Sequence, residues 1–187
     1  EHNPYTIAAL KDMLRTTALK SQLRSTIKEV SGETEQLHIL AADTLKLKAS
    51  DLAPLLGPAG AAFISVDGGH EAIHLVNDIE LGAELLAPGG IIAVDDAFNH
   101  STPGAIEGTC RWFDTRNEGR LAAFAQCYNK LFICRTADHA SWLAQAKEYV
   151  RTHTHQDFAQ RTMQRMEEND AIGFSPRFFD QEIVPFL

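Results

Sequence analysis

Short apolar runs alternate with longer segments of helical periodicity through the middle of the chain. Three runs have the length and composition of buried strands: 37–42, 63–66 and 91–94. Apolar residues spaced three and four apart predict helices in the segments that follow them: 48–56, 71–86 and 105–113. Strands that alternate with helices in this way normally lie parallel in one sheet and are joined by right-handed crossovers. The pattern therefore predicts an α/β fold.

The pattern changes at both ends of the chain. Residues 5–30 have the apolar spacing of one long or two consecutive amphipathic helices. Segments 121–127 and 131–134 are expected to pair as antiparallel strands, because only a short polar turn separates them. One helical run is expected over 139–168, and the aromatic segment 173–187 is expected to be irregular.

These elements predict a Rossmann-like, mostly parallel sheet with a closing antiparallel strand pair and a C-terminal helical extension. We assign residues 1–138 to the Rossmann-like domain and residues 139–187 to the extension. Because apolar tails are usually buried, the extension is expected to pack on the domain or on a partner subunit of a homo-oligomer.

The composition is that of an ordinary globular chain and excludes several classes of protein. A length of 187 residues, of which 44% are hydrophobic and 22% charged, suits one domain with a real core. The formal net charge of -8 argues against nucleic-acid binding, and no apolar window is long enough for a transmembrane helix. The spacing of Cys110, Cys127 and Cys134 favours reduced thiols and a cytoplasmic location. A small molecule is the expected partner.

Charged residues end two of the predicted strands, and strand ends are where ligands bind in open α/β sheets. The second apolar run ends in Asp67-Gly-Gly-His70, and the third ends in Asp95-Asp96. Three carboxylates are therefore expected to converge without a basic neighbour, and they repel unless a cation neutralises them or one takes up a proton. Oxygen ligands suit Mg²⁺. The alternative is that Asp67 and Asp96 only cap the turns that follow.

Several motifs in this region together resemble the class I S-adenosylmethionine-dependent methyltransferases. The closest likeness is to the metal-dependent O-methyltransferases of macrolide sugars and related natural products. The likeness spans about residues 37–135 and depends on four motifs: strand-Asp67-Gly-Gly-His70, Leu86-Ala-Pro-Gly-Gly90, strand-Asp95-Asp96 and Pro103-Gly104.

The resemblance implies methyl transfer from S-adenosylmethionine to a hydroxyl of a small molecule such as a sugar or a phenol. It implies that Asp67, Asp95 and Asp96 hold Mg²⁺ and that His70 is the general base. It also implies that the cofactor contacts three residues: Asp43, Asp67 and Gly68. Asp43 would lie near the adenine; a plain strand-end cap is its alternative role. For His70 the alternative is a bond to the backbone at the start of a helix, and His100 is expected to be a solvated loop residue.

A second motif overlaps the same residues. His70-Glu71-Ala-Ile-His74 satisfies the H-E-x-x-H pattern, in which two histidines one helical turn apart bind zinc and the glutamate activates water. No third ligand stands out downstream, and such a pair normally lies inside a helix. Zinc hydrolysis therefore remains the alternative enzymatic hypothesis.

The first strands of the methyltransferase fold and their glycine-rich loop have no counterpart in this sequence. The family's sheet order is 3-2-1-4-5-7-6, so strands one and two should separate the 37–42 strand from the 63–66 strand. We expect the chain to be the carboxyl part of a longer protein. The alternatives are that strand three pairs directly with strand four, or that another chain supplies the missing strands. A non-catalytic Rossmann-like remnant that serves binding or assembly is the third functional hypothesis.

Overall fold

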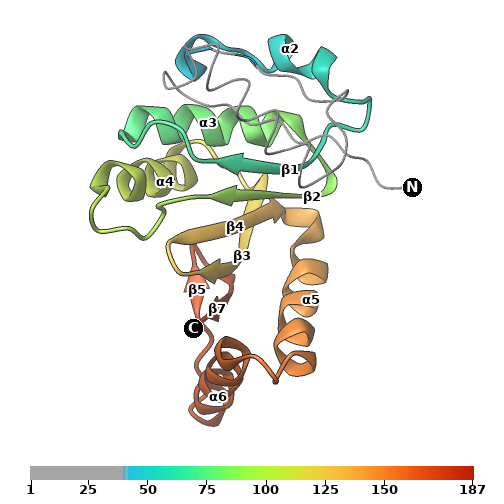
Figure 1. Ribbon diagram of the computed structural model, residues 1–187, viewed down its shortest axis with the longest axis vertical. Coiled ribbons are helices and arrows are strands. Elements are labelled where there is room, and N and C mark those ends of the chain that lie inside the picture. The colour runs from blue at the N-terminus through green and yellow to red at the C-terminus, as the bar shows by residue number, and fades with distance from the viewer. Residues whose placement is uncertain (1–39, 41) are drawn as a thin grey trace.

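The computed structural model describes residue 40 and residues 42–187 (Figure 1). The helices expected over 5–30 and most of the strand expected over 37–42 lie outside the described residues. Leu40 and Ala42, which are described, are not part of a strand. The segment after them forms three short turns of helix: η2 (Thr44–Lys46), α2 (Ala49–Leu52) and η3 (Ala53–Leu55). The helix predicted over 48–56 is thus two short pieces.

The centre of the described chain is a five-stranded sheet in the order β1-β2-β4-β3-β7. Its strands are β1 (Ala61–Val66), β2 (Leu86–Val94), β3 (Leu121–Cys127), β4 (Lys130–Arg135) and β7 (Val184–Phe186). β1 pairs parallel with β2 and β3 parallel with β7, whereas β4 is antiparallel to both of its neighbours. Four of the five strands therefore run in one direction. The sheet is mostly parallel and Rossmann-like, as the sequence predicts, and the closing antiparallel pair is present.

Helices cover both faces of this sheet. α3 (Ala72–Leu85) and α4 (Pro103–Thr115) pack on each other beside β1 and β2, whereas α5 (His139–Thr152) packs against β3 (Figure 1). Side chains alternate between the two faces along a strand, so Ile133 enters the core beneath α3 and α4, and Cys134 enters the core beneath α5. None of the helices in the described part of the chain is long and apolar enough to span a bilayer.

The C-terminal extension differs from its prediction in two ways. The single helical run expected over 139–168 is two helices, α5 and α6 (Asp157–Ala171), separated by a turn from 153 to 156. The tail is not irregular, because β5 (Arg177–Phe178) and β6 (Gln181–Glu182) form a hairpin and β7 joins the sheet beside β3.

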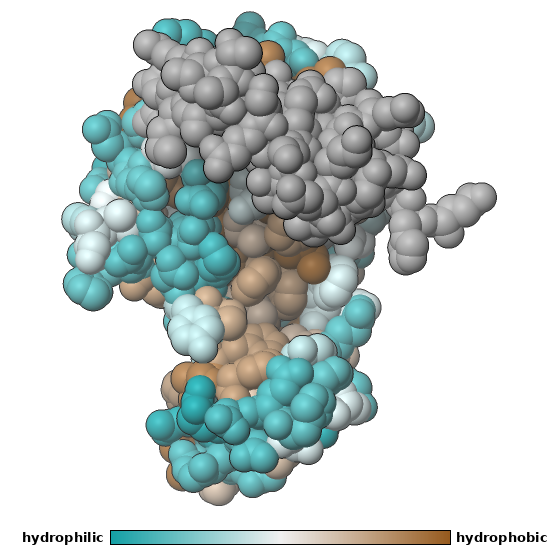
Figure 2. Space-filling model, viewed as in Figure 1, coloured by the Kyte–Doolittle hydropathy of each residue, from teal (hydrophilic) through white to brown (hydrophobic). Residues whose placement is uncertain are grey.

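The tail therefore packs on its own domain. The backbone N–H of Leu187 donates to Thr162 Oγ1 at 2.9 Å, which joins the end of the chain to α6. Apolar surface gathers over the middle of the face seen in Figure 2, above the polar surface of the C-terminal helices.

Candidate functional site

Two loops meet at the carboxyl ends of β1 and β2. Val66 and Val94 are partners in the parallel register, so the residues that follow them leave the sheet side by side. The backbone N–H of Asp95 donates to the carbonyl of Val66 at 2.9 Å, which holds the second loop against the first. Asp67, His70, Asp95 and Asp96 therefore lie at one edge of the sheet, as the sequence predicts.

His70 and Asp96 form the closest contact between the two loops. His70 Nε2 lies 2.9 Å from Asp96 Oδ2, and the Asp96 side chain is only 13% exposed. Asp96 Oδ1 accepts two further bonds, from Asn99 Nδ2 at 2.9 Å and from Asn129 Nδ2 at 2.7 Å. The carboxylate is therefore fixed in place, and the imidazole bound to it is oriented.

The backbone at Asp96 is itself unusual. Its φ is 57°, in the left-handed region that non-glycine residues seldom occupy, although aspartate tolerates it better than most. Such conformations persist where the surroundings over-determine them, and they gather at functional sites. Here the hydrogen bonds from the Asn99 and Asn129 side chains and the contact with His70 supply that constraint.

These bonds also favour the ionised form of Asp96. The hydrogen bonds from Asn99 and Asn129, of which Asn99 has the larger effect, hold the pKa of Asp96 below its ordinary value despite burial. An ionised carboxylate can only accept, so the Nε2 of a neutral His70 carries the proton that binds Asp96. The lone pair is then on Nδ1, in a side chain that is 49% exposed. His70 can therefore accept a proton from a bound molecule.

Asp95 has a basic partner that the sequence interpretation did not foresee. Lys130 Nζ lies 2.6 Å from Asp95 Oδ1, and that oxygen also accepts the backbone N–H of Asp96 at 3.0 Å. The argument that the three carboxylates converge without a basic neighbour is therefore wrong.

Asp67 lies at the outer side of this cluster. Partial burial and the nearby charge of Asp95 raise the pKa of Asp67, while Lys130 and His70 act in the opposite direction. In residues 42–187 no three carboxylate, imidazole or thiol groups are gathered so that they could hold a metal ion. The described contacts of Asp67, Asp95 and Asp96 thus do not fit a three-carboxylate magnesium site, and a bound magnesium ion stays a prediction.

Replacing Asp67 with asparagine is expected to stabilise the fold at pH 7. The raised pKa of Asp67 means that folding favours its protonated form. The contribution of protonated Asp67 to stability is present below the unfolded pKa and is lost as the pH rises through the folded pKa. At pH 7 the ionised carboxylate therefore destabilises the fold, and asparagine removes that charge. Since the side chain is largely exposed, screening limits the gain to at most about 1 kcal/mol.

Thermal melts of Asp67→Asn at pH 7 and at about pH 3, where Asp67 is protonated in both states, measure this effect. We expect a higher melting temperature at pH 7 and no difference from wild type at the lower pH. The control is Asp43→Asn, which should lower the melting temperature at pH 7, because the hydrogen bond with Lys46 lowers the pKa of Asp43. An equal rise in the melting temperature of Asp67→Asn at both pH values would contradict a raised pKa of Asp67.

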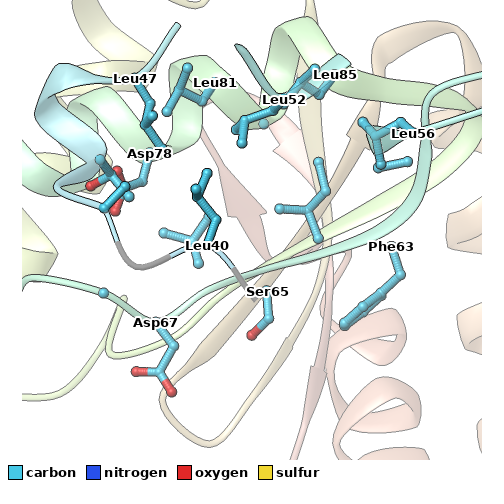
Figure 3. A pocket seen from close by; sticks show the side chains of 17 residues that line it. Leu40, Leu47, Leu52, Leu56, Phe63, Ser65, Asp67, Asp78, Leu81 and Leu85 are labelled. Carbon is cyan, nitrogen blue, oxygen red and sulfur yellow. The ribbon is translucent and has the colours of Figure 1, made fainter. Parts of the chain in front are cut away.

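An apolar groove runs along the outer side of β1 (Figure 3). Its walls come from β1, from α3 and from the helical turns after residue 42, and together with its open mouth it has an empty volume of about 860 Å³. Asp67 and Asp78 lie toward one end, whereas Leu56 and Phe63 lie toward the other (Figure 3). Its mostly apolar lining with a few polar groups at one end is typical of small-molecule sites.

The three residues implied to contact a cofactor are placed differently around this groove. Asp67 and Gly68 line it. Asp43 is not among the lining residues, although its neighbours Ala42 and Thr44 are. Its carboxylate accepts the backbone N–H of Leu45 at 3.1 Å and caps η2, which is the alternative role considered for it.

A second, more polar cleft borders the His70 end of the Asp67–His70 turn. It opens between the first turns of α3 and α4 and is lined by His70, Glu71, His74, Thr102 and Glu107, among others. The two loops are tightly packed at its base, because a Cβ at Gly104 would lie 2.4 Å from the carbonyl oxygen of His70. The exposed His100 is not among the residues that line the cleft.

The H-E-x-x-H motif is not built as a zinc-binding helix. α3 begins at Ala72 with Glu71 as its N-cap, so His70 precedes the helix and only His74 lies within it. The His70 ring contacts Asp96. The helical pair that this mechanism needs is therefore absent from the described chain.

Three residues of the site escaped prediction: Lys130, Asn99 and Asn129. Asn129 and Lys130 come from the β3–β4 hairpin, which reaches the end of β2 because Val94 pairs with Leu131. Asn99 follows Asp96 by three residues, in the same turn.

Comparison with known proteins does not identify a reaction for this chain. No protein-family model and no curated protein matches the chain. A solved structure of a Corynebacterium glutamicum protein, from the Northeast Structural Genomics Consortium, is similar at 14% sequence identity with a TM-score of 0.45. The likeness covers 68% of this chain, and the chain spans 58% of the length of that protein.

Proposed function

We propose that this chain is an S-adenosylmethionine-dependent O-methyltransferase that acts on a hydroxyl of a small molecule. The observation that carries the proposal is the 2.9 Å contact between His70 Nε2 and Asp96 Oδ2 at the ends of two adjacent parallel strands. A histidine that is oriented by a largely buried carboxylate and lines a cleft is a recurring arrangement for a general base.

The order of the strands supports the same proposal. In the methyltransferase sheet, strands four, five, seven and six are neighbours, and strand seven is the antiparallel one. β1, β2, β4 and β3 have that order, with β4 reversed. The motif Asp67-Gly-Gly-His70 then follows strand four and Asp95-Asp96 follows strand five, as the resemblance requires.

Two cavities that border the same turn suit a reaction between two molecules. The apolar groove could hold the adenosine part of the cofactor, and the carboxylates of Asp67 and Asp78 at its polar end suit a positively charged sulfonium. The polar cleft could hold the hydroxyl-bearing acceptor. His70 lines the cleft and lies three residues from Asp67, so one short turn connects the two sites.

The protein's contribution would be to place the acceptor oxygen and to remove its proton. S-adenosylmethionine supplies an electrophilic methyl group when it is bound. His70 Nδ1 accepts the hydroxyl proton as the oxygen forms its bond to the methyl carbon, and the electron pair of the carbon–sulfur bond stays on sulfur. Asp96 stabilises the imidazolium that results, since its low pKa keeps it ionised.

Turnover with simple acceptors tests the proposal. The full chain is incubated with S-adenosylmethionine and either catechol or methyl glycosides, and release of S-adenosylhomocysteine is measured by mass spectrometry. We expect release that depends on the acceptor and that falls about tenfold or more in Asp96→Asn, which removes the charge that stabilises the imidazolium. Acceptor-dependent release that is the same in Asp96→Asn would contradict the assigned base, and no release with any acceptor would favour a non-catalytic binding module.

A further inference from the structure

Lys130 is the cation of the strand-end cluster. It is the first residue of β4, directly after the hairpin turn, and its side chain is 42% exposed. The ammonium reaches Asp95 Oδ1 at 2.6 Å, while the Asp95 side chain is only 16% exposed. Lys130 also lies close enough to Asp67 to offset part of the repulsion between that carboxylate and Asp95.

Three of the six carboxylate oxygens of the cluster already have donors from the protein. Asp96 Oδ1 accepts the amides of Asn99 and Asn129, and Asp96 Oδ2 contacts His70. Asp95 Oδ1 accepts both the ammonium of Lys130 and the backbone N–H of Asp96. A hard divalent cation needs several such oxygens as ligands and would have to displace these donors.

We propose that Lys130 is the resident cation of this site and occupies the role that the resemblance assigns to magnesium. Its ammonium balances the charge of Asp95 and offsets part of the repulsion between Asp95 and Asp67. Because Asp95 Oδ1 also accepts the backbone N–H of Asp96, the ammonium helps to fix the turn in which Asp96 contacts His70. Lys130 is thus a positioning residue, because it acts on the base through two carboxylates. Its role in methyl transfer rests on the proposed function, but the cation assignment itself does not.

Calorimetric titration with magnesium chloride tests the assignment directly. Wild-type protein is expected to give no saturable heat up to about 1 mM Mg²⁺. Lys130→Met leaves Asp67 and Asp95 without their ammonium partner, so its affinity for Mg²⁺ should rise at least about tenfold. Lys130→Arg keeps the charge and should behave as the wild type does.

The matched control is Lys46→Met, which removes an ammonium 3.3 Å from the exposed carboxylate of Asp43, away from the strand ends. It should leave magnesium binding unchanged. Saturable binding of one Mg²⁺ by wild-type protein would overturn the proposal, and this result does not depend on whether any variant folds. Equal Mg²⁺ affinities of Lys130→Met and wild type would overturn it as well.

The titration contains no S-adenosylmethionine, so its result can be interpreted even if the protein is not a methyltransferase. Where turnover is found, a chelator should change the rate less than about twofold, whereas Lys130→Met should lower kcat, because Asp96 and His70 lose their alignment. Loss of turnover on chelation with full recovery on adding Mg²⁺ would contradict Lys130 as the resident cation.

Discussion

Replacing His70 with alanine is expected to lower the rate of methyl transfer by about 10²- to 10⁴-fold, the range over which a positioned general base contributes. The imidazole is the group of the polar cleft that combines an exposed ring with a fixed carboxylate partner, Asp96. Its removal takes away the proton acceptor of that cleft that Asp96 orients. Turnover of the variant and of wild type is compared at saturating acceptor, because the loss should fall on kcat.

The matched control for this variant is His100→Ala. His100 is an exposed histidine in the loop between β2 and α4, close in sequence to Asp96, and it does not line the cleft. Its replacement should change the rate less than about twofold, as expected for a surface substitution outside the site. A His70→Ala enzyme that keeps more than about a third of wild-type turnover would remove His70 from the reaction.

Much of the fold could be predicted because local sequence patterns indicate most of its strands and helices. The run Ile91–Val94 is apolar at every position, as expected for a strand covered on both faces, and the 71–86 segment has helical spacing. The structure places them in β2 and α3. β7 was missed because it is only three residues long and contains Pro185, which lacks a backbone donor and is tolerated mainly at a sheet edge.

The candidate site could be predicted only in part, for a related reason. Asp67 and Asp95 follow strands directly, so a parallel pairing is enough to bring them together. Lys130 reaches Asp95 only because the hairpin of β3 and β4 folds next to β2, and hydrophobic periodicity does not encode which strands are neighbours. The cation that pairs with Asp95 is therefore set by a long-range contact.

Filling the apolar groove is expected to abolish cofactor binding. Ser65 lies on β1, lines the groove and is exposed, so a larger side chain there occupies the groove without entering the core (Figure 3). An indole placed there would overlap the volume proposed for the adenosine part of the cofactor. Ser65→Trp should therefore weaken binding of S-adenosylhomocysteine at least about 100-fold, the equivalent of about 2.7 kcal/mol.

Ser141→Trp is the matched control, because Ser141 is an exposed residue of α5 outside the groove. Thermal melts of both variants serve as the check that the domain remains folded.

Isothermal titration of the full chain with S-adenosylhomocysteine therefore tests the central claim most directly. We predict one saturable site in wild type and in Ser141→Trp, and a loss of that site in Ser65→Trp. The absence of binding by wild type, or equal binding by Ser65→Trp, would contradict a methyl-donor site beside β1.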